Sequence, residues 1–201
     1  MHLGIFGGTF DPPHIGHLAL AFEACHQLEL DNLLWVLTPC PPHKPNQPIT
    51  PLQQRIEMVQ AIVKNEPKFE LSRVEIDRPA PHFAVDTVEI LGDKYPNARL
   101  VYLLGGDSLR DLPFWRQAQK FTRLVDTLGV MHRPRASIDL SALKHDLPNL
   151  REKLFFIEAP LLQISSTDIR QRVRGNRPYR YLLPPLVDNI IIKHGLYASR
   201  F

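Results

Sequence analysis

Short apolar runs of strand length alternate with segments of helical periodicity along nearly all of the 201 residues. Prolines gather mainly between these segments, where they favour loops. The pattern predicts strands at 2–6, 33–38, near 69–76, 99–106, 127–132 and 153–158. It predicts helices at 15–28, 51–64, near 84–95, 113–125, 165–174 and 184–194. Such alternation is typical of an α/β fold, so we expect a Rossmann-like doubly wound parallel sheet with helices on both faces.

The chain length and its hydrophobic fraction of 44% suit a single domain over 1–201, whose C-terminal part, about 160–201, we expect to be mainly helical. No run approaches the roughly 20 apolar residues of a membrane helix. The first residues also lack the pattern of a signal peptide. We therefore expect a cytoplasmic protein without a membrane partner. Cys25 and Cys40 form no metal-like cluster and are expected to be reduced thiols, with Cys25 on the apolar face of its helix.

The loop after the first predicted strand reads GGTFDPPHIGH, residues 7–17. It is neither a G-x-G-x-x-G fingerprint nor a P-loop, but Gly7 and Gly8 permit a close backbone approach to a ligand. The free N–H groups at the start of the following helix favour an anion. His14 and His17 can donate hydrogen bonds to phosphate oxygens. Two alternatives are that these histidines cap and pack a turn, or that they bind zinc, for which further ligands are not evident.

A second polar group, ISSTDIR at 164–170, follows the last predicted strand. Its hydroxyl residues are N-cap types, and Asp168 stands three positions after Ser165, the spacing of a capping box. One interpretation is therefore a well-capped helix. The other is a phosphate cradle at a helix N-terminus, in which Arg170 grips oxygens through two parallel hydrogen bonds.

The H-x-G-H motif of the first loop, followed by I-S-S-T-x-I-R near the other end, resembles the nucleotidyltransferase superfamily of adenylyl- and cytidylyltransferases. Three further stretches, PPHK at 41–44, VDTVEIL at 85–91 and GGDSLRDLPFW at 105–115, narrow the likeness to bacterial nicotinate mononucleotide adenylyltransferases. The resemblance covers nearly the full length. The segment 136–152 carries the least of it.

The resemblance implies that the 5′-phosphate of nicotinate mononucleotide attacks the α-phosphorus of ATP, so that pyrophosphate leaves and nicotinate adenine dinucleotide forms, a step of NAD biosynthesis. Such a reaction depends on alignment and charge neutralisation, because the attacking phosphate is already an anion. We expect Mg²⁺ to arrive with ATP and to be held mainly by substrate oxygens and water, without a metal site of the protein's own.

The resemblance also implies roles for single residues. For catalysis we expect His17, His14 and Arg170. For ATP binding we expect Gly7, Gly8, Thr9, Phe10, Gly16, Gly105, Asp107, Ile164, Ser165, Ser166 and Thr167. For nicotinate mononucleotide we expect Trp115 to stack on the pyridine ring, and Lys44, Thr87 with its neighbouring backbone N–H groups, and Arg133 to serve the carboxylate. Asp107 has the alternative of capping a helix, and Trp115 that of packing in the core.

Two other functions compete with this interpretation. An adenylyltransferase for nicotinamide mononucleotide or phosphopantetheine would use the same phosphate motifs. A nucleic-acid-binding module is suggested only by the net charge of +3, without the basic stripe or interleaved aromatics that such modules show, so we expect no nucleic-acid partner. The sequence leaves open whether the protein is a monomer or a homodimer.

Overall fold

A computed structural model describes residues 1–41, 48–131, 143, 147–160 and 162–198. Its centre is a six-stranded, wholly parallel sheet in the order β3-β2-β1-β4-β5-β6. The strands are β1 His2–Gly8, β2 Asn32–Leu37, β3 Phe69–Ser72, β4 Arg99–Gly105, β5 Thr127–Met131 and β6 Leu154–Ile157. This confirms the expected doubly wound fold. The strand order reverses between β1 and β4, and ligands of such sheets bind outside the strand ends at that reversal.

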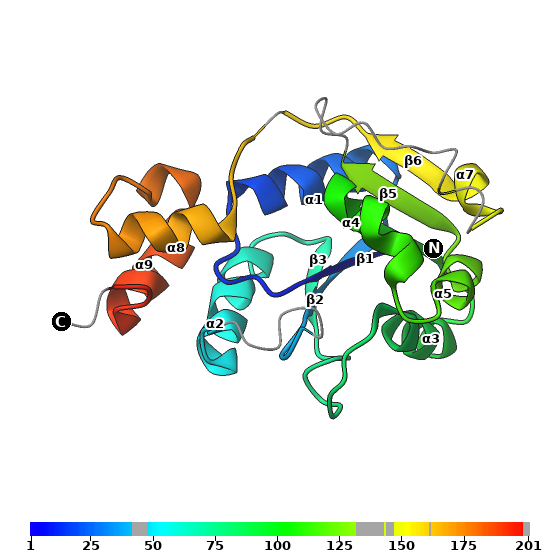
Figure 1. Ribbon diagram of the computed structural model, residues 1–201, viewed down its shortest axis with the longest axis horizontal. Helices are drawn as coiled ribbons and strands as arrows, with labels where there is room; N and C mark the ends of the chain where they lie inside the picture. Colours follow the sequence, from blue (N-terminus) through cyan, green and yellow to red (C-terminus); the bar gives the residue numbers. More distant parts are fainter. Residues whose placement is uncertain (42–47, 132–142, 144–146, 161, 199–201) are drawn as a thin grey trace.

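The helices connect successive strands and continue beyond the last one. They are α1 Ile15–Gln27, α2 Leu52–Val63, α3 Ala84–Lys94, α4 Gly106–Asp111, α5 Ala118–Leu124, α7 Leu150–Lys153, α8 Ser166–Arg174 and α9 Pro185–His194, with short 3₁₀ turns η1 Leu112–Phe114 and η2 Arg180–Leu182. The helices α8 and α9 lie together at one end of the molecule, beside α2 (Figure 1). In the described part of the chain, no helix is both long and apolar enough to cross a membrane.

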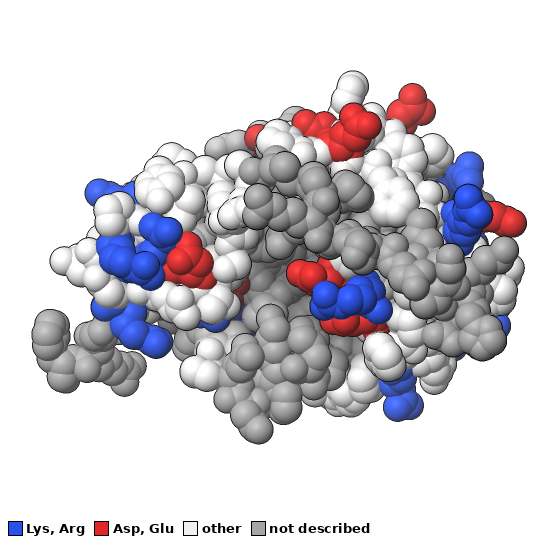
Figure 2. Space-filling view, turned by 45° about the horizontal axis from the view of Figure 1, so that its top comes forward, with Lys and Arg blue, Asp and Glu red and all other residues white. Residues whose placement is uncertain are grey.

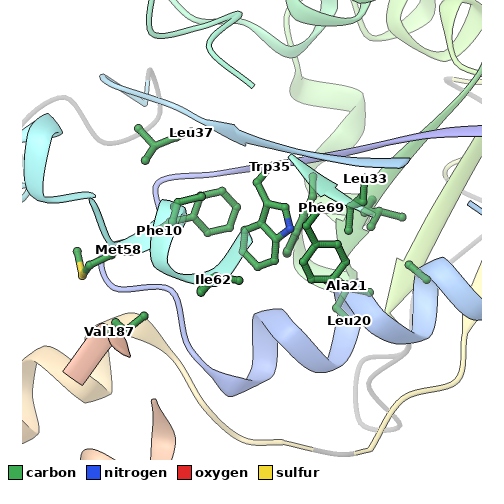
Figure 3. Close-up of a cluster of buried hydrophobic side chains, with 14 of the residues drawn as sticks. Phe10, Leu20, Ala21, Leu33, Trp35, Leu37, Met58, Ile62, Phe69 and Val187 are labelled. Atoms are coloured by element: carbon green, nitrogen blue, oxygen red, sulfur yellow. The ribbon is translucent and has the colours of Figure 1, made fainter. Parts of the chain in front are cut away.

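Each face of the sheet has its own apolar cluster, because side chains alternate along each strand. In β1, Phe6 packs with the cluster that contains α1 and α2, whereas Leu3 and Ile5 pack with the cluster that contains α3 and α5. The first cluster includes the fully buried Trp35, whose ring lies 5.0 Å from that of Phe10 (Figure 3). It also takes in residues of α8 and α9, so the C-terminal helices share this core with the sheet.

Two expected elements differ from the structure. The strand predicted near 69–76 ends at Ser72, because the chain turns there and Asp77 donates its N–H to the carbonyl oxygen of Arg73 over 2.9 Å. The helix predicted over 113–125 is divided into η1 and α5. Gln117 lies between them with a φ of 51°, a left-handed conformation that no helix continues through.

Candidate active site

A cavity of about 360 Å³ opens at the carboxyl ends of the strands, within the usual size range of small-molecule sites. Five segments far apart in sequence surround it: the end of β1 with the loop to α1, residues 48–49, the end of β4, the end of β5, and Pro160 with residues between 162 and 170. Most residues predicted to bind ATP or to act in catalysis line this cavity, namely Gly7, Thr9, Phe10, His14, Gly16, His17, Gly105, Ile164, Ser165, Ser166, Thr167 and Arg170.

The first loop, residues 9–14, follows β1 at this cavity and begins in a constrained conformation. Phe10 has a φ of 47°, which is uncommon for a bulky residue. Its buried ring packs against Phe6 at 5.4 Å and against His17 at 5.3 Å between ring centroids. A Cβ at Gly8 would lie 2.9 Å from the Phe10 ring, so the position requires glycine. Gly8 therefore shapes the loop and is not among the residues that line the cavity.

The two histidines of the H-x-G-H motif stack with 3.7 Å between ring centroids. The backbone N–H of His14 donates to Nδ1 of His17 over 3.1 Å. A ring nitrogen that accepts a hydrogen bond carries no proton, so neutral His17 bears its proton on Nε2. Desolvation of the ring, with a smaller contribution from His14, lowers the pKa of His17 well below its ordinary value. At neutral pH His17 is thus an uncharged N–H donor at the cavity.

The N-terminus of α8 forms the opposite wall of the cavity. Ser165 is its N-cap, and its Oγ accepts the backbone N–H of Asp168 over 3.1 Å, which confirms the capping interpretation for this residue. The Oγ of Ser166 donates to the carbonyl oxygen of Pro12 over 2.9 Å. Arg170 donates from Nη1 to the carbonyl oxygen of Asp11 over 2.7 Å. The helix that was predicted to cradle phosphates is therefore bonded directly to the first loop.

Arg55 is a residue of this region that the sequence analysis did not identify. It is buried on α2, and its guanidinium donates to the carbonyl oxygens of Thr9, Thr38, Pro39 and Thr50 over 2.8–3.2 Å. The signal was present, since a charged residue stands among the apolar positions of the face that α2 buries. A buried charge needs polar partners, and here it fastens the loop after β1 to both described ends of the connection between β2 and α2.

The residues predicted to bind the second nucleotide are placed differently. The side chain of Thr87 is buried, donates to Oε1 of Glu75 over 2.5 Å and accepts from Arg78 over 3.0 Å. Because the hydroxyl of Thr87 is engaged in this way, only neighbouring backbone N–H groups at this position are left to bind a ligand. Trp115 is half-buried, with its ring 5.3 Å from Phe121 and 6.2 Å from Tyr102, so the core-packing alternative accounts for part of its surface.

One more described residue, Asp107, is absent from the cavity wall. Asp107 is exposed and forms an ion pair with Arg110 at 3.6 Å. Its alternative role as a helix cap is wrong, because α4 begins at Gly106 with Gly105 as the N-cap. Lys44 and Arg133 fall outside the described residues.

The polar groups of the cavity suit a polyanion. Among the described residues, no group of three or more His, Cys, Asp or Glu side chains could hold a metal ion. Of the described residues that line the cavity, the acidic one is Asp11, whose two carboxylate oxygens already accept hydrogen bonds from Tyr197 and from the backbone of Thr50. Lys and Arg side chains gather on the end of the molecule that α8 and α9 form, with few acidic side chains among them (Figure 2).

Over residues 5–172 the chain matches the family described as cytidylyltransferase-like. It is 36% identical over 197 residues to the nicotinate-nucleotide adenylyltransferase of Bacillus subtilis, an alignment that covers 98% of each chain. The chain belongs to the nicotinate-nucleotide adenylyltransferase family. Another member, named a probable nicotinate-nucleotide adenylyltransferase in Thermomicrobium roseum, is 42% identical over 98% of this chain and 92% of its own length.

Solved structures show the same architecture as this nicotinate-nucleotide adenylyltransferase family member. The nicotinic acid mononucleotide adenylyltransferase of Plasmodium falciparum complexed with NaAD superposes with a TM-score of 0.78. The two chains are 24% identical, and the match covers 98% of this chain and 97% of the other. At that identity, the likeness establishes the fold.

Proposed function

We propose that this protein transfers the adenylyl group of ATP to nicotinate mononucleotide, forming nicotinate adenine dinucleotide and pyrophosphate in NAD biosynthesis. The family membership supports the reaction class and the acceptor. The observation that carries the proposal is one cavity bounded by the N-termini of two helices, α1 and α8, with His17 and Arg170 in its wall. Such a site offers hydrogen-bond donors and positive dipole ends, the groups that bind phosphates.

The reaction that we propose needs no nucleophilic side chain. An oxygen of the acceptor's 5′-phosphate forms a bond to the α-phosphorus of ATP. The bond from that phosphorus to the oxygen bridging to the β-phosphate breaks, and its electron pair leaves with pyrophosphate. Charge on the transferring group is met by the Nε2–H of His17 and by the backbone N–H groups that begin α1, fixed donors of the kind that stabilise such transition states. Ser165, Thr167 and Arg170 hold the outer phosphates from α8.

We propose that Mg²⁺ enters bound to the phosphates of ATP and supplies further charge neutralisation there. This fits the wall, where both carboxylate oxygens of Asp11 are occupied by Tyr197 and Thr50. The protein's binding partners are then ATP and the mononucleotide. We propose that it acts in the cytoplasm. Light scattering would determine its oligomeric state.

The test is to incubate the purified protein with ATP, Mg²⁺ and one acceptor at a time, and to measure pyrophosphate and identify the second product by mass spectrometry. Nicotinate mononucleotide is expected to give pyrophosphate and the dinucleotide in equal amounts. Nicotinamide mononucleotide and phosphopantetheine are the control acceptors. A faster reaction with either control would replace the proposed acceptor, and pyrophosphate release without an acceptor product would contradict adenylyl transfer.

A further inference from the structure

The carboxylate of Asp11, in the loop between β1 and α1, is buried and fully engaged. Its Oδ1 accepts the hydroxyl proton of Tyr197 over 2.7 Å, across 186 positions of sequence. Its Oδ2 accepts the backbone N–H of Thr50 over 3.2 Å. The charge of Arg55 also acts on this carboxylate, since Asp11 opposes the lowering of the Arg55 pKa that burial causes. A buried carboxylate with this many partners is a fixed point of the loop.

The same loop is held from α8 through its backbone. Arg170 donates to the carbonyl oxygen of Asp11 over 2.7 Å, and Ser166 donates to that of Pro12 over 2.9 Å. Two residues further on, His14 begins the turn that sets the ring of His17. The position of Asp11 therefore fixes the wall that carries His17 and the wall that carries Arg170 relative to each other.

Tyr197 reaches this point by a special backbone path after α9. Gly195 and Tyr197 both have left-handed φ angles, 57° and 65°, which turn the chain back toward the first loop. Burial and the neighbouring Asp11 raise the pKa of Tyr197 far above its ordinary value, so its hydroxyl remains a proton donor at every working pH. A residue other than glycine rarely has such a φ, and the conformation persists only where the surrounding structure holds it in place.

We infer that Tyr197 is a positioning residue, which through the carboxylate of Asp11 holds the first loop against α8 so that His17 and Arg170 face one cavity. It does not touch the substrates and acts only by alignment. This inference rests on the proposed function, because alignment of the two walls matters for a reaction that proceeds by positioning and charge neutralisation. It extends the active machinery to the segment that follows α9, which is absent from the wall of the cavity itself.

The test is Tyr197→Phe, which keeps the aromatic ring and removes the hydroxyl. We expect kcat to fall by about 10- to 100-fold, since small misplacement of reacting groups has effects of that order. The KM values for both substrates should change by less than about threefold, because the contacts that bind them in the ground state remain. Isothermal titration of ATP without acceptor should likewise give a nearly unchanged affinity. Tyr181→Phe is the matched control, as Tyr181 is exposed and its hydroxyl accepts only from Arg172 among the hydrogen bonds described.

A double-mutant cycle with Asp11→Asn tests whether the two residues act as one unit. If they do, the double variant should be no slower than the slower single variant by more than about twofold. Multiplying losses, or a folded Tyr197→Phe protein with kcat within about twofold of the wild type, would overturn the inference. Should Tyr197→Phe be unfolded at the assay temperature, Asp11→Asn is compared with Tyr181→Phe in the same way. An inactive wild-type protein would instead refute the proposed function.

Discussion

The chemistry of the site depends on which proton each side chain holds. His17 accepts the backbone N–H of His14 at Nδ1, and its pKa is lowered by burial, so we propose that it meets the substrates as a neutral donor. The sequence suggested two imidazoles that could also carry positive charge. We propose a different division, in which His17 supplies a directed N–H and Arg170, also in the cavity wall, supplies the fixed positive charge.

Replacing His17 by alanine should therefore remove a donor while leaving the fold intact. We expect kcat to fall by about 10²–10³, the usual effect of deleting one donor that acts in the transition state. His26→Ala is the control, because His26 is an exposed histidine on the same helix. Steady-state rates with circular dichroism on both variants make the comparison. A folded His17→Ala protein with near wild-type kcat would remove His17 from the mechanism.

The lowered pKa of His17 also predicts a pH dependence of stability. Because the unfolded chain binds a proton at this histidine at a higher pH than the folded protein does, unfolding becomes easier as pH falls below the ordinary histidine range. Above that range His17 is neutral in both the folded and the unfolded chain, so this destabilising effect disappears. His17→Gln should therefore lose less melting temperature than the wild type between about pH 6.5 and 5. The control is His26→Gln, measured in the same way. Parallel curves of melting temperature against pH for His17→Gln and the wild type would contradict the expectation.

At the scale of elements, α8 has two tasks. Its N-terminus faces the cavity, and its Arg170 also bonds to the first loop. Arg170→Ala should raise the KM for ATP and lower kcat, with a much smaller effect on binding of the mononucleotide. Arg170→Lys should restore only part of this, because an ammonium group lacks the planar fork of donors. Titration of each substrate against each variant provides the measurement. Equal losses for both substrates would mean that Arg170 supports the site as a whole and does not contact ATP.

The elements themselves were largely predictable, because apolar periodicity is a local property. The parallel sheet, α1, α2, α3, α8 and α9 all follow from it within a few residues. The break at Gln117 was not predictable, since the sequence around it suits a helix and no glycine marks the left-handed position. Arg55 and Tyr197 were missed for a related reason, as their partners lie in segments distant in sequence.

At the scale of the whole molecule, the two phosphate motifs meet because of chain topology. The loop after β1 lies at the reversal of strand order, and the segment after β6 crosses from the sheet edge to place α8 opposite that loop (Figure 1). The motifs predicted this meeting, whereas the residues predicted to bind the second nucleotide stand in separate segments of the sequence, whose relative positions no local pattern determines. We propose that 1–201 is a single domain, because one apolar cluster joins α8 and α9 to the sheet.

We expect hydrogen-bond donors to determine which pyridine nucleotide the protein accepts. A nicotinate carboxylate has only acceptor oxygens, whereas the amide of nicotinamide also carries an NH₂ donor. Arg78 donates to the carbonyl oxygens of Pro81 and Phe83 and so fixes the turn before α3, where the free backbone N–H groups of that helix begin. In a pocket of donors, the amide's NH₂ would face other donors, and a buried polar group left unpaired costs about 1–3 kcal/mol.

We therefore expect kcat/KM for nicotinate mononucleotide to exceed that for nicotinamide mononucleotide by at least about 10²-fold, a floor below the largest discriminations of this type. Paired initial-rate assays with the two mononucleotides measure the ratio. Trp115→Ala should lower activity with both, since stacking on a pyridine ring does not distinguish a carboxylate from an amide. It should leave the ratio within about threefold of the wild-type value, because the hydrogen-bond donors that set the discrimination remain. A wild-type ratio near one would contradict the donor-lined pocket, because equal rates require a site that satisfies the amide's N–H groups as well as the carboxylate's oxygens.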